Sequence, residues 1–234
     1  MEGVSKKVRS IREGLGPWIV DKPDPYAIVL EGRLNTYRHY VKRKKLVGDR
    51  FICDVVADTA FAYDDDGRVV WYSSIYGLTS AIDLMTIFLD SKNPDYIVLI
   101  GSCGLDREIS KKTVVIPRTA SQEMQDIRGT ADEVMTRTAI QIAERNGLDV
   151  VVTDRHVSKF SLVRSLGKAS GESEDLEAAS VYYMANSYRV PVVGILGVSD
   201  YKCDNYIYYV EYEEELKDDV FALASRTLRE LKNS

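Results

Sequence analysis

Residues that could do chemistry follow two of the apolar runs in this chain. The run IVLIG ends in Gly101 and is followed by Ser102, Cys103 and Gly104, so two glycines flank a hydroxyl and a thiol. Backbone amides beside glycines can approach an anion or a sugar closely. The same spacing is also typical of an ordinary tight turn, and this stretch alone favours neither interpretation.

Two carboxylates take positions where a ligand could meet them. Glu177 follows the acidic pair Glu174 and Asp175 in a predicted first helical turn, where it could accept hydrogen bonds from vicinal hydroxyls. Asp200 comes directly after the apolar run of residues 192–198, and a carboxyl group there could protonate a leaving group. The alternative for Glu177 is an exposed acid favoured by the helix dipole. The alternative for Asp200 is an aspartate that caps a turn or a helix.

Composition excludes several classes of protein. The 234 residues are 45% hydrophobic, enough for a full core, and the net charge of -5 argues against a nucleic-acid surface. We interpret the basic cluster of residues 42–45 as a solvated loop or helix end. No apolar run reaches the roughly 18 residues of a membrane span, and the N-terminal residues lack the apolar core of a signal peptide. We therefore expect a cytoplasmic protein that binds neither nucleic acid nor membrane.

Cysteine and histidine show no metal-binding spacing. Cys53, Cys103 and Cys203 are odd in number and form no CxxC motif, which predicts reduced thiols. His39 and His156 lie far apart in the sequence. We expect no metal site and no cofactor.

Apolar periodicity predicts alternating strands and helices in a single domain over residues 1–234, with residues 1–25 as a possible N-terminal arm. Strands are predicted over residues 26–32, 50–63, 68–75, 96–101, 112–117, 148–153 and 192–198, and helices over 78–90, 130–146, 173–188 and 212–234. Unbroken apolar strands between helices indicate an α/β layered fold, in which ligands bind outside the carboxyl ends of the strands.

Three motifs in order resemble those of the nucleoside phosphorylase and nucleosidase superfamily. They are IVLIGSCGLDREISKKTVVIP, SEDLEAASVYYMA and RVPVVGILGVSD. The resemblance implies a three-layer α/β fold of the phosphorylase/hydrolase type, with a central twisted mixed sheet flanked by helices. It also implies cleavage of the N-glycosidic bond of a purine nucleoside, most directly by phosphorolysis to free base and ribose 1-phosphate.

The resemblance also assigns roles to individual residues. Asp200 would protonate the purine as its bond to the sugar breaks, Glu177 would bind the ribose hydroxyls, and Leu176 would lie under the sugar. The phosphate or nucleophile side would comprise Gly32, Ser80, Gly101, Ser102 and Gly104. Ser199, His156 and Cys103 would contact the base. Inorganic phosphate would be the co-substrate, and Arg43 would reach the site of a neighbouring subunit in a homodimer, trimer or hexamer.

Two positions depart from the phosphorylase pattern. Leu99 and Thr36 stand where phosphorylases of this superfamily carry arginines, and a phosphate dianion needs cationic or multiple amide donors. Two alternatives therefore stand beside phosphorolysis: hydrolysis of a nucleoside or nucleotide, and nucleoside binding by a catalytically weakened relative.

Overall fold

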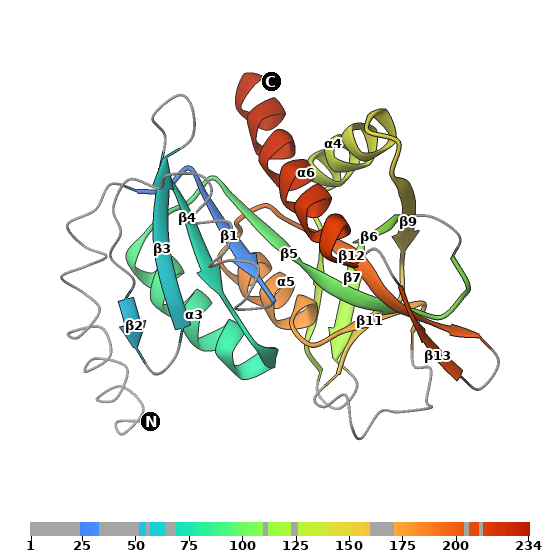
Figure 1. Cartoon of the computed structure of the whole chain (residues 1–234). Coiled ribbons are helices and arrows are strands. Elements are labelled where there is room, and N and C mark those ends of the chain that lie inside the picture. Colours follow the sequence, from blue (N-terminus) through green and yellow to red (C-terminus); the bar gives the residue numbers. More distant parts are fainter. Residues whose placement is uncertain are drawn as a thin grey trace.

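The computed structural model describes residues 24–32, 52–54, 57–63, 69–109, 112–122, 126–159, 171–203, 206–210 and 213–234. A central mixed sheet carries helices on both faces (Figure 1). One face is covered by α3 (Gly77–Ser91) and α5 (Ala178–Ser187), and the other by α4 (Glu133–Arg145) and α6 (Glu213–Asn233). This confirms the predicted three-layer α/β class.

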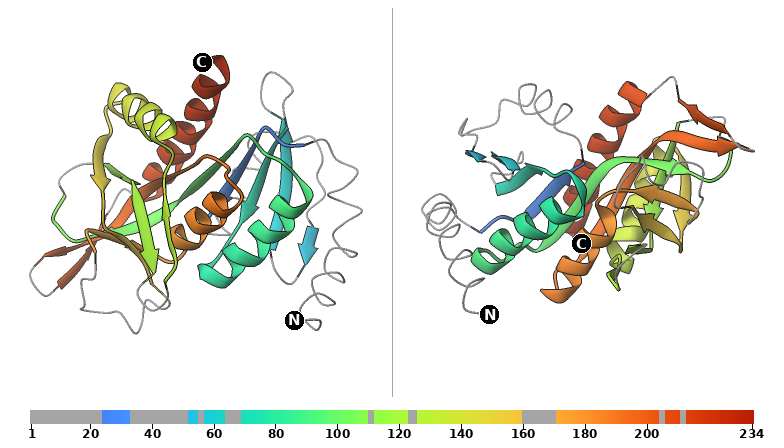
Figure 2. Two further views of the ribbon diagram at one scale, coloured as in Figure 1. Left: turned by 180° about the vertical axis from the view of Figure 1, so that it is seen from behind. Right: turned by 90° about the horizontal axis from the view of Figure 1, so that it is seen from below.

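The strands of the sheet are short at its edges and long at its centre. Their bounds are β1 (Ala27–Glu31), β2 (Ile52–Asp54), β3 (Ala57–Tyr63), β4 (Val69–Ser74), β5 (Tyr96–Leu105), β6 (Thr113–Pro117), β7 (Thr119–Gln122), β8 (Arg128–Thr130), β9 (Asp149–Thr153), β10 (His156–Ser158), β11 (Ser173–Asp175), β12 (Val192–Cys203) and β13 (Tyr206–Tyr209). Strands β4, β1, β5 and β12 are parallel neighbours, and β6, β11 and β13 join this centre antiparallel. Figure 2 shows the layers from behind and from below.

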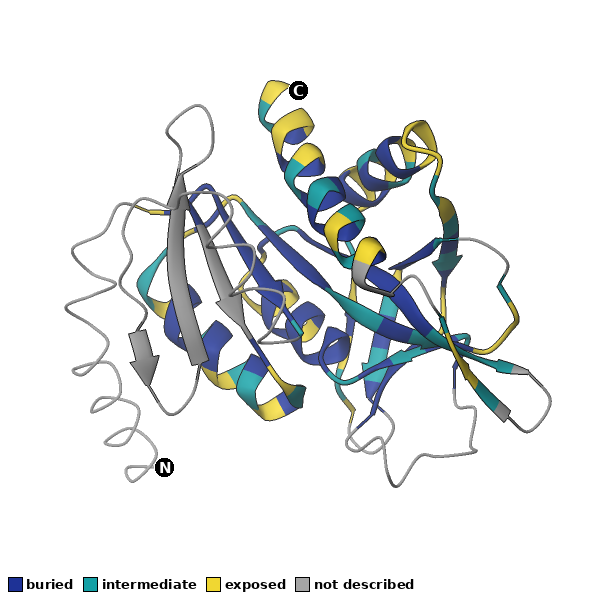
Figure 3. Ribbon diagram, viewed as in Figure 1, coloured by how far each residue is buried: buried dark blue, intermediate teal, exposed yellow. Residues whose placement is uncertain are grey.

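The central strands β1, β5 and β12 each contain a long apolar run, because both faces of the sheet are covered there. In β5, Ile97 and Leu99 pack on the side of α3 and α5, whereas Val98 and Ile100 pack on the side of α4 and α6. Side chains alternate between the two faces of a strand, so a strand buried on both faces reads as an unbroken apolar run. Figure 3 shows this buried centre beneath helices whose outer faces are exposed.

Two connections set the order of the first strands. Strands β3 and β4 pair antiparallel. Strand β4, helix α3 and strand β5 form a parallel crossover, with β1 placed between the two strands. The carboxyl end of β1 consequently lies beside Ile100 of β5, and the carboxyl end of β5 lies beside Tyr201 of β12. In α/β folds ligands bind at this edge of the sheet.

Both strands that bear the first and last motifs are longer than predicted. Strand β5 continues to Leu105 and β12 continues to Cys203, because each gains a new partner beyond the apolar run. Gly101 and Gly104 are therefore extended strand residues rather than parts of a tight turn. Asp200 lies within β12, and the register with β5 shifts between Val198 and Asp200.

Other boundaries also differ from the predictions. The predicted strand 50–63 contains two strands, β2 and β3, that pair antiparallel. The predicted helix from Ser173 begins only at Ala178, because residues 173–175 form β11. The helix predicted over residues 130–146 begins at Glu133, and Asp132 caps it by accepting a hydrogen bond from the amide of Met135. Strands β7, β8, β10, β11 and β13 were not predicted, since three or four residues carry too little periodicity.

Some predictions lie outside the described residues. These are Arg43, Thr36 and most of the possible N-terminal arm. Within the described part of the chain, no helix combines the length and apolar character that crossing a membrane requires.

Tyr182 ties helix α5 to the sheet. Its ring is fully buried, and its hydroxyl donates to the carbonyl of Pro117 and accepts from the amide of Gly194, both at 2.8 Å. A single phenol therefore satisfies buried polar groups on β6 and β12.

Removing that hydroxyl should cost stability. We expect Tyr182→Phe to lower the free energy of unfolding by about 2 kcal/mol, because both backbone groups lose a buried partner. Chemical denaturation measures the change, and Tyr183→Phe, at a side chain that is 41% exposed, is the matched control. Equal stability of the two variants would contradict this role.

Candidate functional site

Glu177 lies at the start of α5 with its carboxylate turned toward β1 and α3. The residue is 6% exposed and precedes the first helical residue, yet its side chain makes no capping bond to its own helix. Its Oε1 instead accepts a hydrogen bond of 2.8 Å from the amide of Gly77, the first residue of α3. The positive end of a helix dipole favours a carboxylate at that point.

Gly32 leaves room for this carboxylate, and Gly101 lies beside Gly32. A Cβ atom added at Gly32 would lie 3.2 Å from Oε2 of Glu177, closer than ordinary van der Waals contact. Gly101 follows in the next strand, and a Cβ atom there would lie 3.6 Å from the amide nitrogen of Gly32. The structure thus brings together three predicted site residues, Glu177, Gly32 and Gly101, at the end of β1 and the middle of β5.

Asp200 lies on the other side of β5, in β12, and three residues further along β5 than Gly101. The register pairs Asp200 with Gly104, and a Cβ atom at Gly104 would lie 2.9 Å from Oδ2 of Asp200. Ser199 donates a hydrogen bond of 2.8 Å to Oδ1 of Asp200, and its hydroxyl also lies 3.4 Å from the carbonyl of Cys103. Asp200 is half-buried, so solvent or a ligand can reach a carboxyl group whose orientation Ser199 restricts.

Cys103 lies beneath this group. It is 2% exposed, and the pKa of its thiol is raised well above the ordinary value, chiefly by burial and further by the negative charges of Asp175 and Asp200. A buried neutral thiol can pack under a ligand but is a poor nucleophile.

The remaining residues predicted for the nucleophile and sugar sides are half-buried. The hydroxyl of Ser80, in the first turn of α3, accepts a hydrogen bond of 3.4 Å from the amide of Tyr76. Leu176 is half-buried beside Glu177. Ser102 lines a small pocket of about 20 Å³, together with Glu31, Ile100, Gly101, Lys217, Val220 and Phe221. That volume admits a water molecule.

His156 does not face the site. Its side chain is completely buried in β10, with Nδ1 2.7 Å from the hydroxyl of Ser173 and Nε2 3.0 Å from Oδ1 of Asp175. The predicted contact between His156 and the base does not fit this enclosure, because the side chain is completely buried. Sequence reasoning missed the partners of His156, since the two strands that pair them are three residues each.

A second charged group lies next to the site. Lys159 and Lys202 both contact Oε2 of Glu174, at 2.6 and 2.9 Å. Glu174 in β11 pairs with Gly104 in β5, and Gly104 in turn pairs with Asp200 in β12. Lys202 lies in β12 itself, two residues after Asp200. In the described part of the chain, no group of three or more His, Cys, Asp or Glu side chains could hold a metal ion.

Comparison with solved structures identifies the fold. The chain superimposes with a TM-score of 0.69 on an AMP nucleosidase from Bacteroides thetaiotaomicron, over 96% of this chain and 98% of that one at 12% identity. A 5′-methylthioadenosine/S-adenosyl homocysteine nucleosidase from Campylobacter jejuni gives 0.67, over 88% and 97% at 12% identity. A futalosine hydrolase mutant from Helicobacter pylori gives 0.68, over 88% and 98% at 10% identity. The fold is that of the nucleoside phosphorylase and nucleosidase superfamily.

Sequence comparison is weaker but agrees. A DeoD-type purine nucleoside phosphorylase from Bacillus velezensis is 23% identical over 174 residues, which cover 66% of this chain and 75% of that enzyme. No family model matches the chain. The superfamily resemblance predicted from the three motifs is thus confirmed at the level of fold.

Burial of Cys103 has a measurable consequence. Because its thiol pKa is raised, little thiolate is present at pH 8, and we expect Cys103 to resist alkylation by iodoacetamide in the native protein. In denaturant the same cysteine should react readily. Peptide mass spectrometry of the Cys103 peptide measures both rates, and rapid native alkylation would contradict the buried position.

Proposed function

We propose that the chain is an enzyme that cleaves the N-glycosidic bond of a purine nucleoside. The observation that carries this proposal is the placement of two carboxyl groups beside glycines, one just after β1 and one near the end of β5. Glu177 lies against Gly32, and Asp200 lies against Gly104. The superfamily fold supports the same reaction.

Asp200 is the general acid in this proposal. Breaking the glycosidic bond builds negative charge on the base and positive charge on the ribose. A proton from the Asp200 carboxyl group to N7 of the purine neutralises the leaving base. Ser199, hydrogen-bonded to Oδ1, restricts the rotation of that carboxyl group.

Glu177 orients and stabilises the sugar. A carboxylate that accepts hydrogen bonds from the 2′ and 3′ hydroxyls fixes the ring, and its charge favours the cationic transition state. The amide of Gly77 donates to Oε1 of this carboxylate, and a carboxylate can accept several hydrogen bonds at once. Gly32 allows the sugar side of the site to approach the backbone closely.

Phosphate is the acceptor predicted from the sequence. The glycines of β5 and the hydroxyls of Ser102 and Ser80 supply the amides and hydroxyls that would surround it. The name of the Bacillus velezensis relative supports this choice.

Water is the second candidate, and Leu99 favours it. Leu99 is 1% exposed and pairs with Leu30 and Gly194 in the centre of the sheet, so its position offers no contact to an anion. The three solved structures of similar fold are named as nucleosidases or a hydrolase.

Loss of the acid should abolish most of the activity. We expect Asp200→Asn to lower kcat/KM for base release by roughly 10²–10⁴-fold, the usual contribution of general acid catalysis. Chromatographic detection of free purine measures the rate. Asp126→Asn, at a side chain that is 99% exposed, is the control and should retain full activity. Unchanged turnover of Asp200→Asn would exclude Asp200 as the acid.

The acceptor is decided by a phosphate titration. Purine ribonucleosides, a nucleoside 5′-monophosphate and a 5′-thioether nucleoside are incubated with and without inorganic phosphate, and both base and sugar products are identified. Phosphorolysis predicts that base release requires phosphate and yields ribose 1-phosphate. Equal release without phosphate, with free ribose as product, would establish hydrolysis. Binding without release in every case would contradict the enzymatic proposal.

A further inference from the structure

Strands β10 and β11 place four polar side chains on one buried face. His156 pairs with Ser173 and Ser158 pairs with Asp175 in a parallel register. Residues two apart in a strand point to the same side, so all four side chains share a face. Each is 5% exposed or less, whereas burying polar groups is unfavourable unless they are paired.

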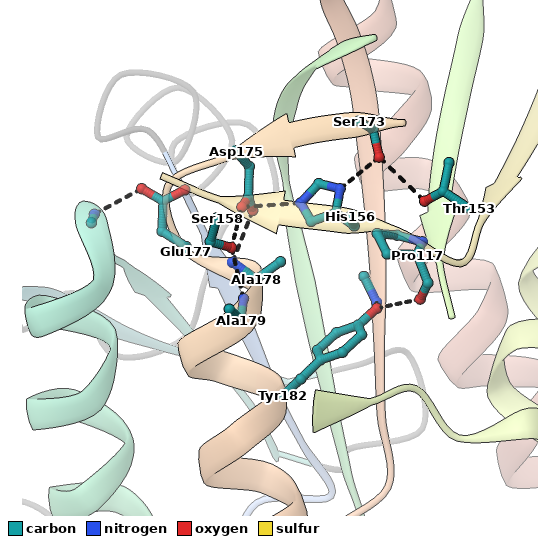
Figure 4. Close-up of polar contacts among 12 residues, drawn as sticks. Pro117, Thr153, His156, Ser158, Ser173, Asp175, Glu177, Ala178, Ala179 and Tyr182 are labelled. Carbon is teal, nitrogen blue, oxygen red and sulfur yellow. Dashed lines mark hydrogen bonds and ion pairs between the residues drawn. The ribbon is translucent and has the colours of Figure 1, made fainter. Parts of the chain in front are cut away.

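These side chains form a continuous chain of polar contacts, drawn in Figure 4. The hydroxyl of Ser173 lies 3.2 Å from that of Thr153 and 2.7 Å from Nδ1 of His156. Nε2 of His156 lies 3.0 Å from Oδ1 of Asp175, although at an angle unlike that of a straight hydrogen bond. Ser158 donates to the same oxygen at 2.5 Å.

The chain of contacts ends on the first amides of helix α5. Oδ2 of Asp175 accepts from the amide of Ala178, and the hydroxyl of Ser158 accepts from the amide of Ala179, both at 2.8 Å. The first amides of a helix have no partner within the helix, and a side chain just before it normally satisfies them. Here residues from two strands do so in place of Glu177.

This arrangement affects Glu177 directly. Glu177 immediately precedes the two capped amides, and its own side chain makes no cap bond. Because Asp175 and Ser158 already occupy those amides, the carboxylate of Glu177 is directed to Gly77 and Gly32 instead. One oxygen of Asp175, Oδ2, faces the amide of Ala178, and the other, Oδ1, contacts His156. His156 therefore restricts the rotation of the Asp175 carboxylate.

We propose that His156 and Asp175 are positioning residues that hold the Glu177 carboxylate in place to bind the ribose hydroxyls. The ribose-binding role of Glu177 in this inference rests on the proposed function. The position of its carboxylate comes from the structure alone. It also gives His156 a function other than the predicted contact with the base. The residues act through the backbone of α5 and do not touch the substrate.

The test uses His156→Phe, which keeps a ring of similar size in β10 and removes its contacts to Ser173 and Asp175. We expect the preference for a purine ribonucleoside over its 2′-deoxy form, measured as a ratio of kcat/KM values, to fall about tenfold, the effect of one weakened hydrogen bond to a charged group. Protection of the Gly77 amide against hydrogen exchange, measured by NMR, should fall as well.

Val157→Ala is the matched control. Val157 is buried in the same strand but points to the other face, so its truncation should lower the melting temperature without changing the ribose preference or Gly77 protection. Should His156→Phe fail to fold, Ser158→Ala decides by the same two readouts. A folded variant with wild-type ribose preference and wild-type Gly77 protection would overturn the proposal.

The two proposals fail in different ways. If the wild-type protein releases no base, the proposed function is wrong, yet Gly77 protection in His156→Phe still tells whether the network positions Glu177. If the wild-type protein is active and the variant changes neither readout, only the positioning role is wrong.

Discussion

The parallel pairing of β5 with β12 is the constraint on which the candidate site depends. It brings Asp200 beside Gly104, and the irregularity after Val198 determines which β12 side chain meets that glycine. A shift of one residue would turn the carboxyl group to the opposite face of the sheet. Since both strands are buried on both faces by apolar side chains, such a shift would also expose or displace much of the core.

Glycines determine how close the carboxylates come to the backbone. At Gly32 and Gly104 an added Cβ atom would lie 3.2 and 2.9 Å from an oxygen of Glu177 and Asp200, respectively. The strand pairing and the absent side chains therefore act together. The strand pairing sets the order of the groups across the sheet. The missing side chains of the glycines leave the space in which a sugar could meet a carboxylate.

The buried polar network adds a different kind of constraint. Apolar packing fixes α5 against the sheet, but packing alone does not determine where the first turn of a helix begins. The bonds from Asp175 and Ser158 to the amides of Ala178 and Ala179 determine it here. Polar contacts of this kind are directional, whereas hydrophobic burial is not.

Much of the fold could be predicted from the sequence, because β1, β5, β6, β12, α3 and α6 carry strong apolar periodicity. Asp200 and Glu177 could be proposed from the sequence because each follows such an element or a recognisable motif. The extended conformation of Gly101 and Gly104 was not predicted, because it depends on pairing with β11 and β12, which lie far away in sequence. The buried position of His156 was missed for the same reason, since only the pairing of β10 with β11 reveals its partners.

We propose that Glu177 and Asp200 meet one ligand, the first beside Gly32 and the second beside Gly104. A crystal structure of the Asp200→Asn variant with a bound purine ribonucleoside tests this most directly. The account predicts the ribose hydroxyls within hydrogen-bonding distance of Glu177 and N7 of the purine next to residue 200. A nucleoside bound elsewhere, or bound here with its base against Glu177, would contradict it.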